Sequence, residues 1–477
     1  MTESSADSSS VRFWPWLVAI AALGLAGRVG YIIVFSSRLN FGLDSVWYQL
    51  EGGALASGHG YVDPQHLFES GRDVATAFRP PLYPGLLAVV VRWIGESRQT
   101  LQLAGVVTGT VSIVAIGVLG RRVGGSRVGI VAAALAAVSP ALIGFDASLM
   151  SETLYVPIVA GLLLMTYVAI DRPTPLRWIG VGALCGLGAL TRGDAVVLFA
   201  VLVIPSILVL RRPWKFRMLF VAAALTGVAL LVGPWLARNQ SELGRPTLAT
   251  LDAGTALAGT NCPAVYEGPL LGFWDHECTV RANDARVSEV ERNDRLQRDG
   301  LKYAFNHVSR WPVVVPVRVL RLWGLWDPIT QARLESIESR NSSWQVITWV
   351  AHLLLTGCAV AGFVLMARRR RRWLPLAATL ASVTLAAALS YGKQRFLAAA
   401  EPALLVAGAF SVVAICDRPE TVRPFLHRMR CCIHDVRGLR PPRRSRSSAT
   451  DGPRSRRRAR RGSDRRSVHV RVHGGAG

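Results

Sequence analysis

Residues 13–50 read "FWPWLVAIAALGLAGRVGYIIVFSSRLNFGLDSVWYQL". The stretch begins with an apolar run of the length that crosses the hydrocarbon core of a bilayer, about 17–25 residues. The run passes into a loop with a single carboxylate, Asp44, and the aromatic residues Trp47 and Tyr48 follow one helical turn later. The stretch therefore predicts a membrane-spanning helix that delivers an acidic side chain to the membrane surface.

Apolar residues dominate the rest of the chain as well. Of its 477 residues, 51% are hydrophobic and 18% are charged, and most charges fall between apolar runs. The first run is too long for the apolar core of a typical signal peptide and lacks a clear small-residue cleavage site, so we predict a retained span. The chain has neither a Walker-type loop nor a dinucleotide fingerprint, which argues against a soluble nucleotide-sugar donor site.

Five arginine-rich segments set the predicted orientation, because short cytoplasmic loops carry an excess of Lys and Arg. These segments are residues 121–127, 171–177, 211–217 and 368–372 and the C-terminal tail. With all five inside, both termini are cytoplasmic and the remaining loops are outside. The ten predicted crossings are then 13–36, 100–120, 128–145, 153–170, 178–191, 194–210, 218–237, 345–366, 373–390 and 398–416.

The predicted outer loops are about residues 37–99, 146–152 and 238–344. Within the first of them, residues 79–95 read "RPPLYPGLLAVVVRWIG", a short apolar run that opens with prolines and contains Arg92. We interpret this run as a helix at the outer surface rather than a crossing. Outer loops of this length can build a site that faces away from the cytoplasm.

The sequence therefore predicts an all-α polytopic plasma-membrane protein with about ten transmembrane helices and long outer first and fourth loops. Residues 1–12 are expected to form a cytoplasmic segment and residues 13–416 the membrane domain. Residues 417–477 hold 18 arginines and five acidic residues and should form a disordered basic tail. On a membrane protein, such a tail is expected to contact anionic membrane lipids inside the cell rather than nucleic acid.

Five segments carry a resemblance to a known group of enzymes. They are "LDSVWYQLEGGALASGHGY" (43–61), "FRPPLYPGLLA" (78–88), "LMSETLYVP" (149–157), "GALTRGDAVV" (188–197) and "KQRFLAAAEP" (393–402). In this order and spacing the chain resembles membrane glycosyltransferases of the C-type fold, above all protein O-mannosyltransferases and lipid A aminoarabinose transferases (glycosyltransferase family 39/83-like). The resemblance implies a polyprenyl-phosphate sugar as donor, used outside, and an acceptor lipid, protein or glycan.

The resemblance also implies roles for particular residues. By match, Asp44 is the acid that acts on the acceptor, Glu152 is the second-loop acid, and Arg79 is the basic residue before the loop proline. The family often has Asp-Glu where this chain has Asp-Ser, so a second first-loop acid stays open, and Asp63 or Glu51 could serve.

Glycosyl transfer from a phosphate needs a base for the acceptor's proton and cations for the departing phosphate. A placed carboxylate suits the first task, so we predict Asp44 as the general base, with inversion at the sugar. Alternatively, Asp44 only caps the helix that follows it. Glu152 either orients the acceptor or a metal, or serves as the acidic residue that favours the start of the fourth span.

Basic residues near the span ends are candidates for the donor phosphate, because Arg can grip phosphate with two hydrogen bonds. The alternative for each is anchoring at the membrane edge. The candidates are Arg79, Arg395, Arg238 and Lys393. Aromatic residues of the first loop are predicted to contact the sugar, and they are Trp47, Tyr48 and Tyr83.

Two further features concern structure. Arg28 lies inside the first predicted span, where a charge is costly, so it should face the bundle and pair with an acid or contact substrate. Among the cysteines, only Cys262 and Cys278 fall in an outer loop, where a disulfide is plausible. We predict no metal site and no cofactor, although the sequence leaves a divalent metal open.

The predicted function is therefore a membrane glycosyltransferase of the cell envelope. A transporter or lipid-linked glycan flippase would also explain the spans and Arg28, but it predicts internal repeats, and none is convincing here. A non-catalytic scaffold is the third class. Clustering of Asp44, Glu152 and Arg79 around one outer cavity would favour the enzyme.

Overall fold

The computed structural model describes residues 12–417 except 37–38, 40–41, 248–249, 281–286 and 337–340. The predicted N-terminal segment and basic tail therefore lie outside the described residues, apart from one residue of each. The described part of the chain is helical and forms no strand; one isolated bridge pairs Val62 with Ala75.

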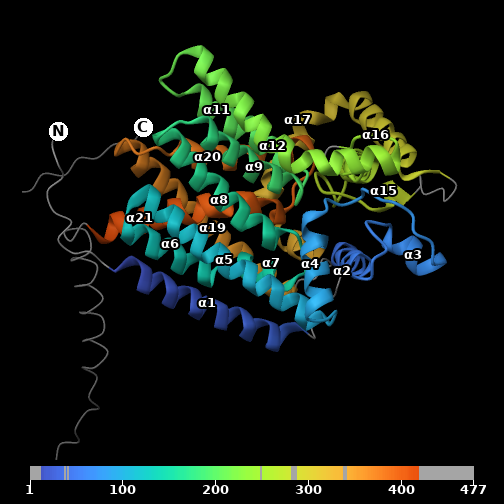
Figure 1. Ribbon diagram of the computed structural model, residues 1–477, viewed down its shortest axis with the longest axis horizontal. Coiled ribbons are helices and arrows are strands. Elements are labelled where there is room, and N and C mark those ends of the chain that lie inside the picture. Colours follow the sequence, from blue (N-terminus) through green and yellow to red (C-terminus); the bar gives the residue numbers. More distant parts are fainter. Residues whose placement is uncertain are drawn as a thin grey trace, which may run out of the picture. The chain divides into compact units, whose positions relative to one another are not determined.

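A helix covers each of the ten segments that the sequence predicts to cross the membrane (Figure 1). These helices are α1 (Phe13–Phe35), α5 (Arg98–Gly124), α6 (Ser126–Val138) with α7 (Pro140–Ala147), α8 (Glu152–Asp171), α9 (Pro175–Ala189), α10 (Ala195–Leu198) with the π-helix η2 (Phe199–Val203) and α11 (Ile204–Leu208), α12 (Trp214–Leu243), α19 (Ser342–Arg368), α20 (Leu374–Leu389) and α21 (Glu401–Cys416).

Length and composition single out some of these helices as spans. Within the described ranges, α1, α5, α8, α12 and α19 are each long and apolar enough to cross a membrane, and the bent pair α6–α7 makes a sixth if counted as one. The other helices are shorter, so the total of ten crossings stays a prediction.

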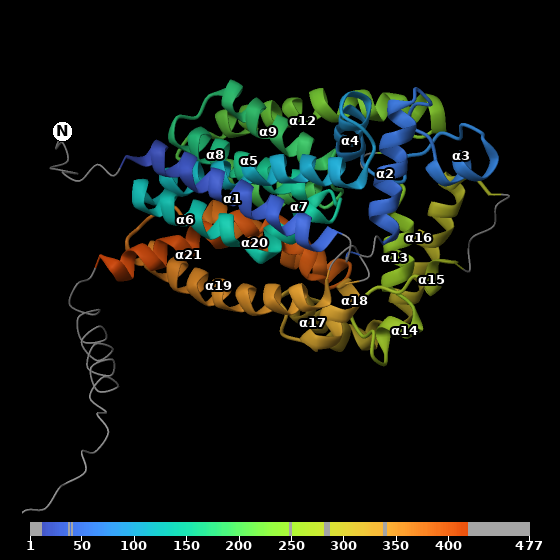
Figure 2. The ribbon, with the colours of Figure 1, turned by 90° about the horizontal axis from the view of Figure 1, so that it is seen from below.

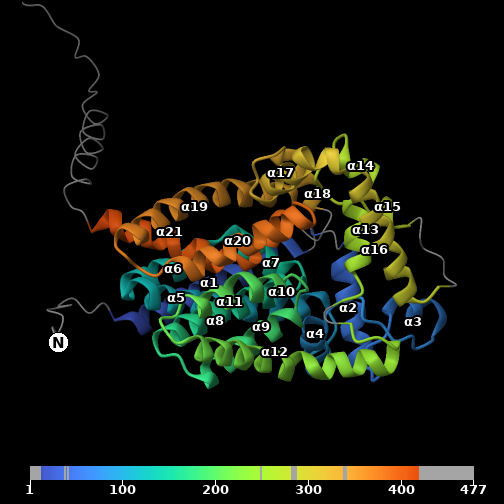
Figure 3. The ribbon, with the colours of Figure 1, turned by 90° about the horizontal axis from the view of Figure 1, so that it is seen from above.

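Two loop regions carry helices of their own. The first loop, between α1 and α5, holds α2 (Leu43–Ala56), α3 (Pro64–Ser70) and α4 (Leu82–Trp93). The long loop, between α12 and α19, holds α13 (Ala253–Thr260), α14 (Pro263–Tyr266), α15 (Glu277–Val280), α16 (Glu289–Asn306), η3 (Val308–Arg310), α17 (Trp311–Leu322) and α18 (Pro328–Ser336). A 3-10 helix, η4 (Gln394–Ala399), joins α20 to α21. Figures 2 and 3 show α2, α3 and α13–α16 together at one end of the bundle.

The helix predicted at residues 79–95 is present as α4, which packs against α2 and α5. The predicted separation of residues 178–191 from 194–210 is also present. Helix α9 ends at Ala189, a tight turn closes with the amide of Arg192 donating to Gly188 O at 2.8 Å, and α10 begins at Ala195. This turn brings the charged residues of "TRGD" to the loop end of the bundle.

Small residues let the bundle helices approach each other closely. On α9, a Cβ on Gly182 would lie 1.9 Å from Ala224 O of α12, and a Cβ on Gly227 of α12 would lie 2.1 Å from Ile179 O. Lipid tails are as apolar as leucine, so helices in a bilayer associate largely through such backbone-close packing. The α9–α12 contact therefore depends on these two glycines.

Arg28 pairs with an acid inside the bundle, as the sequence predicted without naming the partner. Its Nε donates to Asp146 Oδ2 at 2.6 Å, and its terminal nitrogens donate to the carbonyls of Ala136 and Ala137 at 3.1 and 3.0 Å. Those carbonyls lie just before the 52° bend between α6 and α7, where Pro140 has no N–H to offer. The Arg28–Asp146 pair is thus structural, because Arg28 supplies hydrogen bonds to backbone carbonyls at the break between α6 and α7.

Candidate active site

Asp44 lies in the first turn of α2, between two arginines. Its Oδ1 accepts a hydrogen bond from Arg79 Nη2, and its Oδ2 accepts from Arg395 Nη1 and Nη2, both at 3.0 Å. The N-cap of α2 is Gly42, and no side chain caps the helix. The alternative that Asp44 serves only as the helix cap is therefore wrong, because both carboxylate oxygens bind arginine.

The pair Arg79–Asp44 belongs to a longer run of charges. Arg79 Nη1 also donates to Asp252 Oδ2 at 2.7 Å. On the other side, Arg395 Nε lies 3.6 Å from Glu152 Oε1, a carboxylate with 0% exposure. Four acids alternate with three arginines in this network, which thereby joins the first loop, the long loop, η4, the start of α8 and the α9–α10 turn.

The α9–α10 turn completes the network. Arg192 Nη1 donates to Glu152 Oε1 at 2.6 Å, and Arg192 Nε donates to Asp194 Oδ1 at 3.1 Å. Glu152 is thus held by two arginines, and each cation of the network contacts two acids. Such an alternating run of opposite charges compensates charges that would be costly to bury singly.

A cavity of about 540 Å³ lies against this network. Its charged wall consists of Arg79, Glu152, Arg192, Asp194, Asp252 and Arg395. An apolar part of the wall comes from α20, which contributes Val383, Ala386 and Leu389. Ligand-binding cavities usually have volumes of about 300–1,000 Å³, and an apolar wall facing a few placed charges suits an amphiphilic anion.

The two acids that contact Arg79 have pKa values shifted in opposite directions. Burial alone would raise the pKa of Asp44, but Arg79 and Arg395 hold it well below its ordinary range, with a further contribution from Lys393. Burial raises the pKa of Asp252 to about 6, against the opposing effect of Arg79. Asp44 therefore stays ionised in the resting protein, whereas Asp252 gains a proton in mild acid.

The predicted aromatic residues fall into two groups. Tyr48 lines the cavity, and its hydroxyl lies 3.4 Å from Ser151 Oγ. Tyr83 packs edge-on against Tyr48 with 5.0 Å between ring centres, and Trp47 packs on Phe78 at 5.0 Å. Of these three aromatic residues, only Tyr48 lines the cavity. Asp44 is not among the lining residues either, and it is connected to the cavity wall through Arg79 and Arg395.

Two of the predicted phosphate-binding residues are outside the cavity wall. Arg238 donates to the backbone oxygens of Thr76, at 2.6 Å, and Tyr61, at 2.5 Å, so it braces the first loop. Lys393 is buried, with its Nζ 5.6 Å from the ring centre of Phe273. Neither residue therefore lines the cavity, as Arg79 and Arg395 do, although Lys393 is close enough to Asp44 to help lower the pKa of that carboxyl.

The two alternative first-loop acids have other surroundings. Asp63 caps α3, because its Oδ1 accepts from the amides of Gln65 and His66 at 2.9 and 3.2 Å. Glu51 is buried, and burial, reinforced by Asp63, raises its pKa to about 9. A carboxyl group that is protonated at neutral pH cannot accept a proton there, so Glu51 does not suit the role of base. Asp63 is used as the cap of α3, and neither acid lines the cavity.

Sequence reasoning missed Arg192, Asp194 and Asp252 as members of the charge network. The first two were visible as the charged part of a tight turn between apolar runs, in the segment "TRGD" that also carries the resemblance. Asp252 gave no local signal, because it is one of many charged residues in the long loop and only the fold brings it to Arg79.

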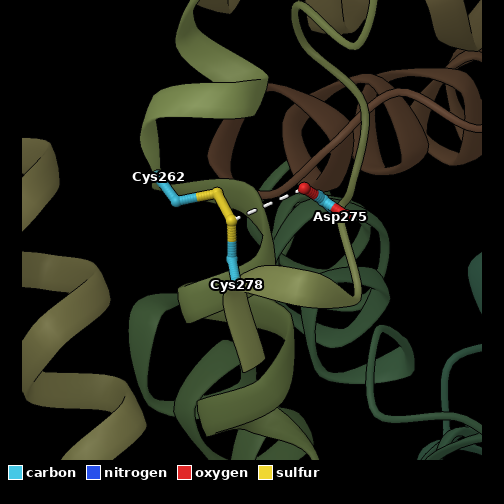
Figure 4. Close-up of side chains that lie close together, drawn as sticks. All are labelled: Cys262, Asp275 and Cys278. Carbon is cyan, nitrogen blue, oxygen red and sulfur yellow. Dashed lines mark hydrogen bonds between the residues drawn. A yellow bond between two sulfur atoms is a disulfide. The ribbon is translucent and has the colours of Figure 1, made fainter. Parts of the chain in front are cut away.

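The structure joins Cys262 and Cys278 by a disulfide in the long loop (Figure 4). Asp275 Oδ2 lies 3.7 Å from Cys278 Sγ, and these three residues form a group with metal-ligand spacing. With the sulfurs bonded to each other, the group offers no thiolate to a metal. A bridge across 16 residues stabilises a chain by about 3 kcal/mol through the unfolded state.

We expect a membrane-impermeant maleimide to leave Cys262 and Cys278 unlabelled until a reductant is added. The matched control is Cys262→Ser, which frees the Cys278 thiol and should label without reductant. Mass spectrometry of the labelled peptides measures the result. Ready labelling of both cysteines in the unreduced parent protein would show that the bridge does not form in cells.

Comparisons with known proteins place these observations in a family context. Residues 78–237 match a family model described as dolichyl-phosphate-mannose-protein mannosyltransferase. Among curated proteins, none matches the chain. Among solved structures, the chain is similar to the Archaeoglobus fulgidus oligosaccharyltransferase in its apo form, with 14% identity and a TM-score of 0.50 over 89% of this chain and 53% of that chain.

The same archaeal enzyme, tethered to an acceptor peptide, matches with 14% identity and a TM-score of 0.50 over 85% of this chain and 50% of that one. The chain thus spans about half the length of these oligosaccharyltransferases. ArnT from Cupriavidus metallidurans bound to undecaprenyl phosphate matches with 16% identity and a TM-score of 0.43 over 84% and 78% of the two chains. The chain has the C-type fold of membrane glycosyltransferases, and the resemblance predicted from its sequence is confirmed.

Proposed function

We propose that the protein is an integral membrane glycosyltransferase that moves a sugar from a polyprenyl-phosphate donor to an acceptor on the extracytoplasmic side, with inversion. The observation that carries this proposal is the position of Asp44 between Arg79 and Arg395, both of which line a cavity of about 540 Å³. The cavity combines three arginines, paired with carboxylates, with an apolar wall, and a lipid-borne phosphate requires both cations and an apolar surface.

The two arginines supply the contacts for the phosphate. Both bind Asp44 in the structure, and a phosphate offers more charge and more acceptor oxygens for the same N–H groups. The apolar residues Val383, Ala386 and Leu389 belong to a bundle helix, α20, so they can contact the first part of a prenyl chain. The donor thus displaces Asp44 from its arginines.

This displacement prepares Asp44 to act as the base. While Arg79 and Arg395 contact it, the carboxylate has a low pKa and is a weak proton acceptor. Once phosphate occupies the arginines, the pKa rises toward its ordinary value and Asp44 accepts the proton of the acceptor hydroxyl. The acceptor oxygen then bonds to the anomeric carbon as the bond from that carbon to the phosphate oxygen breaks, and the phosphate leaves on the arginines.

Glu152, predicted as a second catalytic acid, is assigned a positioning role. It is fully buried and lies between Arg395 and Arg192, so its charge fixes both guanidinium groups at the cavity wall. The family match at residues 78–237 favours mannose as the transferred sugar. A protein, lipid or wall-glycan hydroxyl fits the proposed chemistry equally as the acceptor.

The proposed site faces outward, and the topology can be tested directly. A reporter that is active only outside the cytoplasm should give signal when fused after Gly259, in the long loop, and none when fused after Pro213, between α11 and α12. Expression of each fusion, measured by immunoblot, is the control. Signal after Pro213 would reverse the orientation and would place the charge network on the cytoplasmic side.

We expect activity to fall in mild acid because of Asp252. Its pKa of about 6 means that its carboxylate, which holds Arg79, is ionised above that pH and neutral below it. Donor kcat/KM should therefore decline by up to about tenfold per pH unit below pH 6, while Asp44 stays ionised. The Asp252→Asn variant should lose this acid limb. If Asp252→Asn keeps the same limb, another group controls it.

The central test uses the purified full chain in liposomes with radiolabelled polyprenyl-phosphate mannose and an envelope extract as acceptor. We expect the radiolabelled sugar to move from the donor lipid to a protein, glycan or glycolipid fraction of the extract. A parallel screen with pentosyl and aminoarabinosyl donors tests the other sugars. The flippase alternative predicts translocation of a fluorescent lipid-linked sugar with no transfer. Translocation without transfer to any fraction would overturn the glycosyltransferase proposal.

A further inference from the structure

A second cavity shares no lining residue with the active-site cavity. It measures about 230 Å³ and runs between α6–α7 and α19, with α21 as its floor. Figure 2 shows α21 between α6 and α19, and α21 packs against both. The side walls are apolar and include Leu135, Val138, Leu355 and Leu405. None of its lining residues belongs to the charge network.

The buried end of this groove is polar and contains side-chain atoms that have no hydrogen-bond partner among the described residues. Gln345 Nε2, His352 Nδ1 and Glu401 Oε2 are buried, and none has a hydrogen-bond partner among the described residues. All three side chains line a narrow chamber of about 20 Å³ that shares His352 and Glu401 with the larger groove. A space of this size holds one water or one hydroxyl group. Because an unpaired buried polar atom costs about 1–3 kcal/mol, three of them in one place indicate that a polar group, either a water or the hydroxyl of a ligand, occupies the chamber.

The groove opens on an apolar surface of the helix bundle. Its walls are bundle helices, and their outward residues are apolar, with Val138 on α6 and Leu354 on α19 about 70% exposed (70% and 69%). A ligand of this groove therefore arrives from the lipid phase with an apolar body. The bend between α6 and α7 forms part of the groove wall, since Ser139 and Pro140 both line the groove.

The charges of the lining argue against an anionic head group, and the one acidic residue of the lining, Glu401, can accept a hydrogen bond. The residues that line the groove and its inner chamber include no Arg or Lys, so a phosphate head would be buried without a cation. A hydroxyl both donates and accepts, which suits the amide N–H of Gln345 together with His352 and Glu401. We propose that this groove is a second lipid site, which binds an uncharged lipid with a hydroxyl head group.

This site is separate from the proposed donor site but shares one segment with it. On η4, Arg395 and Phe396 line the active-site cavity, whereas Gln394 and Leu397 line the inner chamber of the groove. The active-site cavity and the inner chamber of the groove therefore contact different residues of the same short helix, η4. Binding in the groove is measured without sugar transfer, so its failure and the failure of the proposed function are distinguishable.

The test uses the full chain in phosphatidylcholine nanodiscs and a long-chain alcohol that carries a diazirine in its chain. Its methyl ether, its phosphate ester and the corresponding amine serve as competitors. We expect the alcohol to label residues 135–141 or 348–355, and unlabelled alcohol to compete about 2- to 10-fold better than the ether, the range of one hydrogen bond. The phosphate ester and the amine should compete no better than the ether.

Two variants make the result specific. Ala351→Trp fills the groove and should reduce labelling about tenfold or more, whereas Leu354→Trp, on the outward face of the same helix, should not. His352→Phe keeps an aromatic ring but removes the ring nitrogens, so it should abolish the preference for the alcohol over the ether. This second variant keeps the proposal testable if Ala351→Trp does not fold. Labelling that is equal in all variants, or stronger competition by the phosphate ester or the amine, would overturn the proposal.

Discussion

Replacing Asp44 by Asn is expected to lower kcat for sugar transfer by about 10²- to 10⁴-fold, the usual contribution of a placed general base. Asn has the same size as Asp but cannot take up the acceptor's proton. The measurement is single-turnover transfer from radiolabelled polyprenyl-phosphate mannose by the purified protein in liposomes. Thermal unfolding of the variant checks that the loss is chemical.

Donor binding separates this role from a purely structural one. In the resting protein, Asp44 competes with the phosphate for Arg79 and Arg395. The neutral variant should therefore bind the donor as tightly as the parent or more tightly, while its turnover fails. Asp63→Asn is the matched control, because Asp63 caps α3 in the same loop and Asn is an equally good cap. Near-normal turnover of Asp44→Asn would exclude Asp44 as the base.

The helices could be predicted from the sequence because the bilayer imposes their length. Each predicted crossing corresponds to a helix, and even the division of residues 178–210 at "TRGD" follows from the rise of 1.5 Å per residue. The bend at Pro140 was not predicted, since residues 128–145 read as one apolar run. Proline ends the hydrogen-bond ladder there, and Arg28 replaces the lost partners from another helix.

The site was accessible to sequence reasoning in part. Asp44, Glu152, Arg79 and Arg395 were each identified from a separate segment, and the structure brings all four into one network. Their pairing was not accessible, because residues separated by as many as 351 positions meet only through the fold.

Which of the predicted residues line the cavity also depends on the fold. Arg238 follows an apolar run in the sequence, but in the structure it lies inside α12, and the sequence cannot show that its guanidinium donates to backbone carbonyls of the first loop. Trp47 and Tyr48 are neighbours in sequence, yet only Tyr48 lines the cavity, because successive helix positions point about 100° apart.

Arg395→Gln is expected to weaken use of the donor by about 10- to 150-fold, the effect of losing one charge-assisted contact of about 1.5–3 kcal/mol. Arg395 is the residue that links Asp44 to Glu152, and it lines the cavity. The loss should therefore appear in donor KM and donor Kd, with acceptor KM nearly unchanged. Arg79→Gln should behave in the same way, since Arg79 holds the other oxygen of Asp44.

The conservative variant and a matched control decide whether Arg395 binds phosphate or only braces the network. Arg395→Lys keeps the charge but loses the two-point grip, so its donor Kd should lie between those of the parent and Arg395→Gln. Arg238→Gln removes an arginine of the same loop end that contacts backbone carbonyls, so it should lower the unfolding temperature without a selective change in donor Kd. If Arg395→Gln lowers the unfolding temperature but leaves donor Kd unchanged, the phosphate must be held by other groups of the cavity wall, and Arg79 and Arg192 are the remaining cations there.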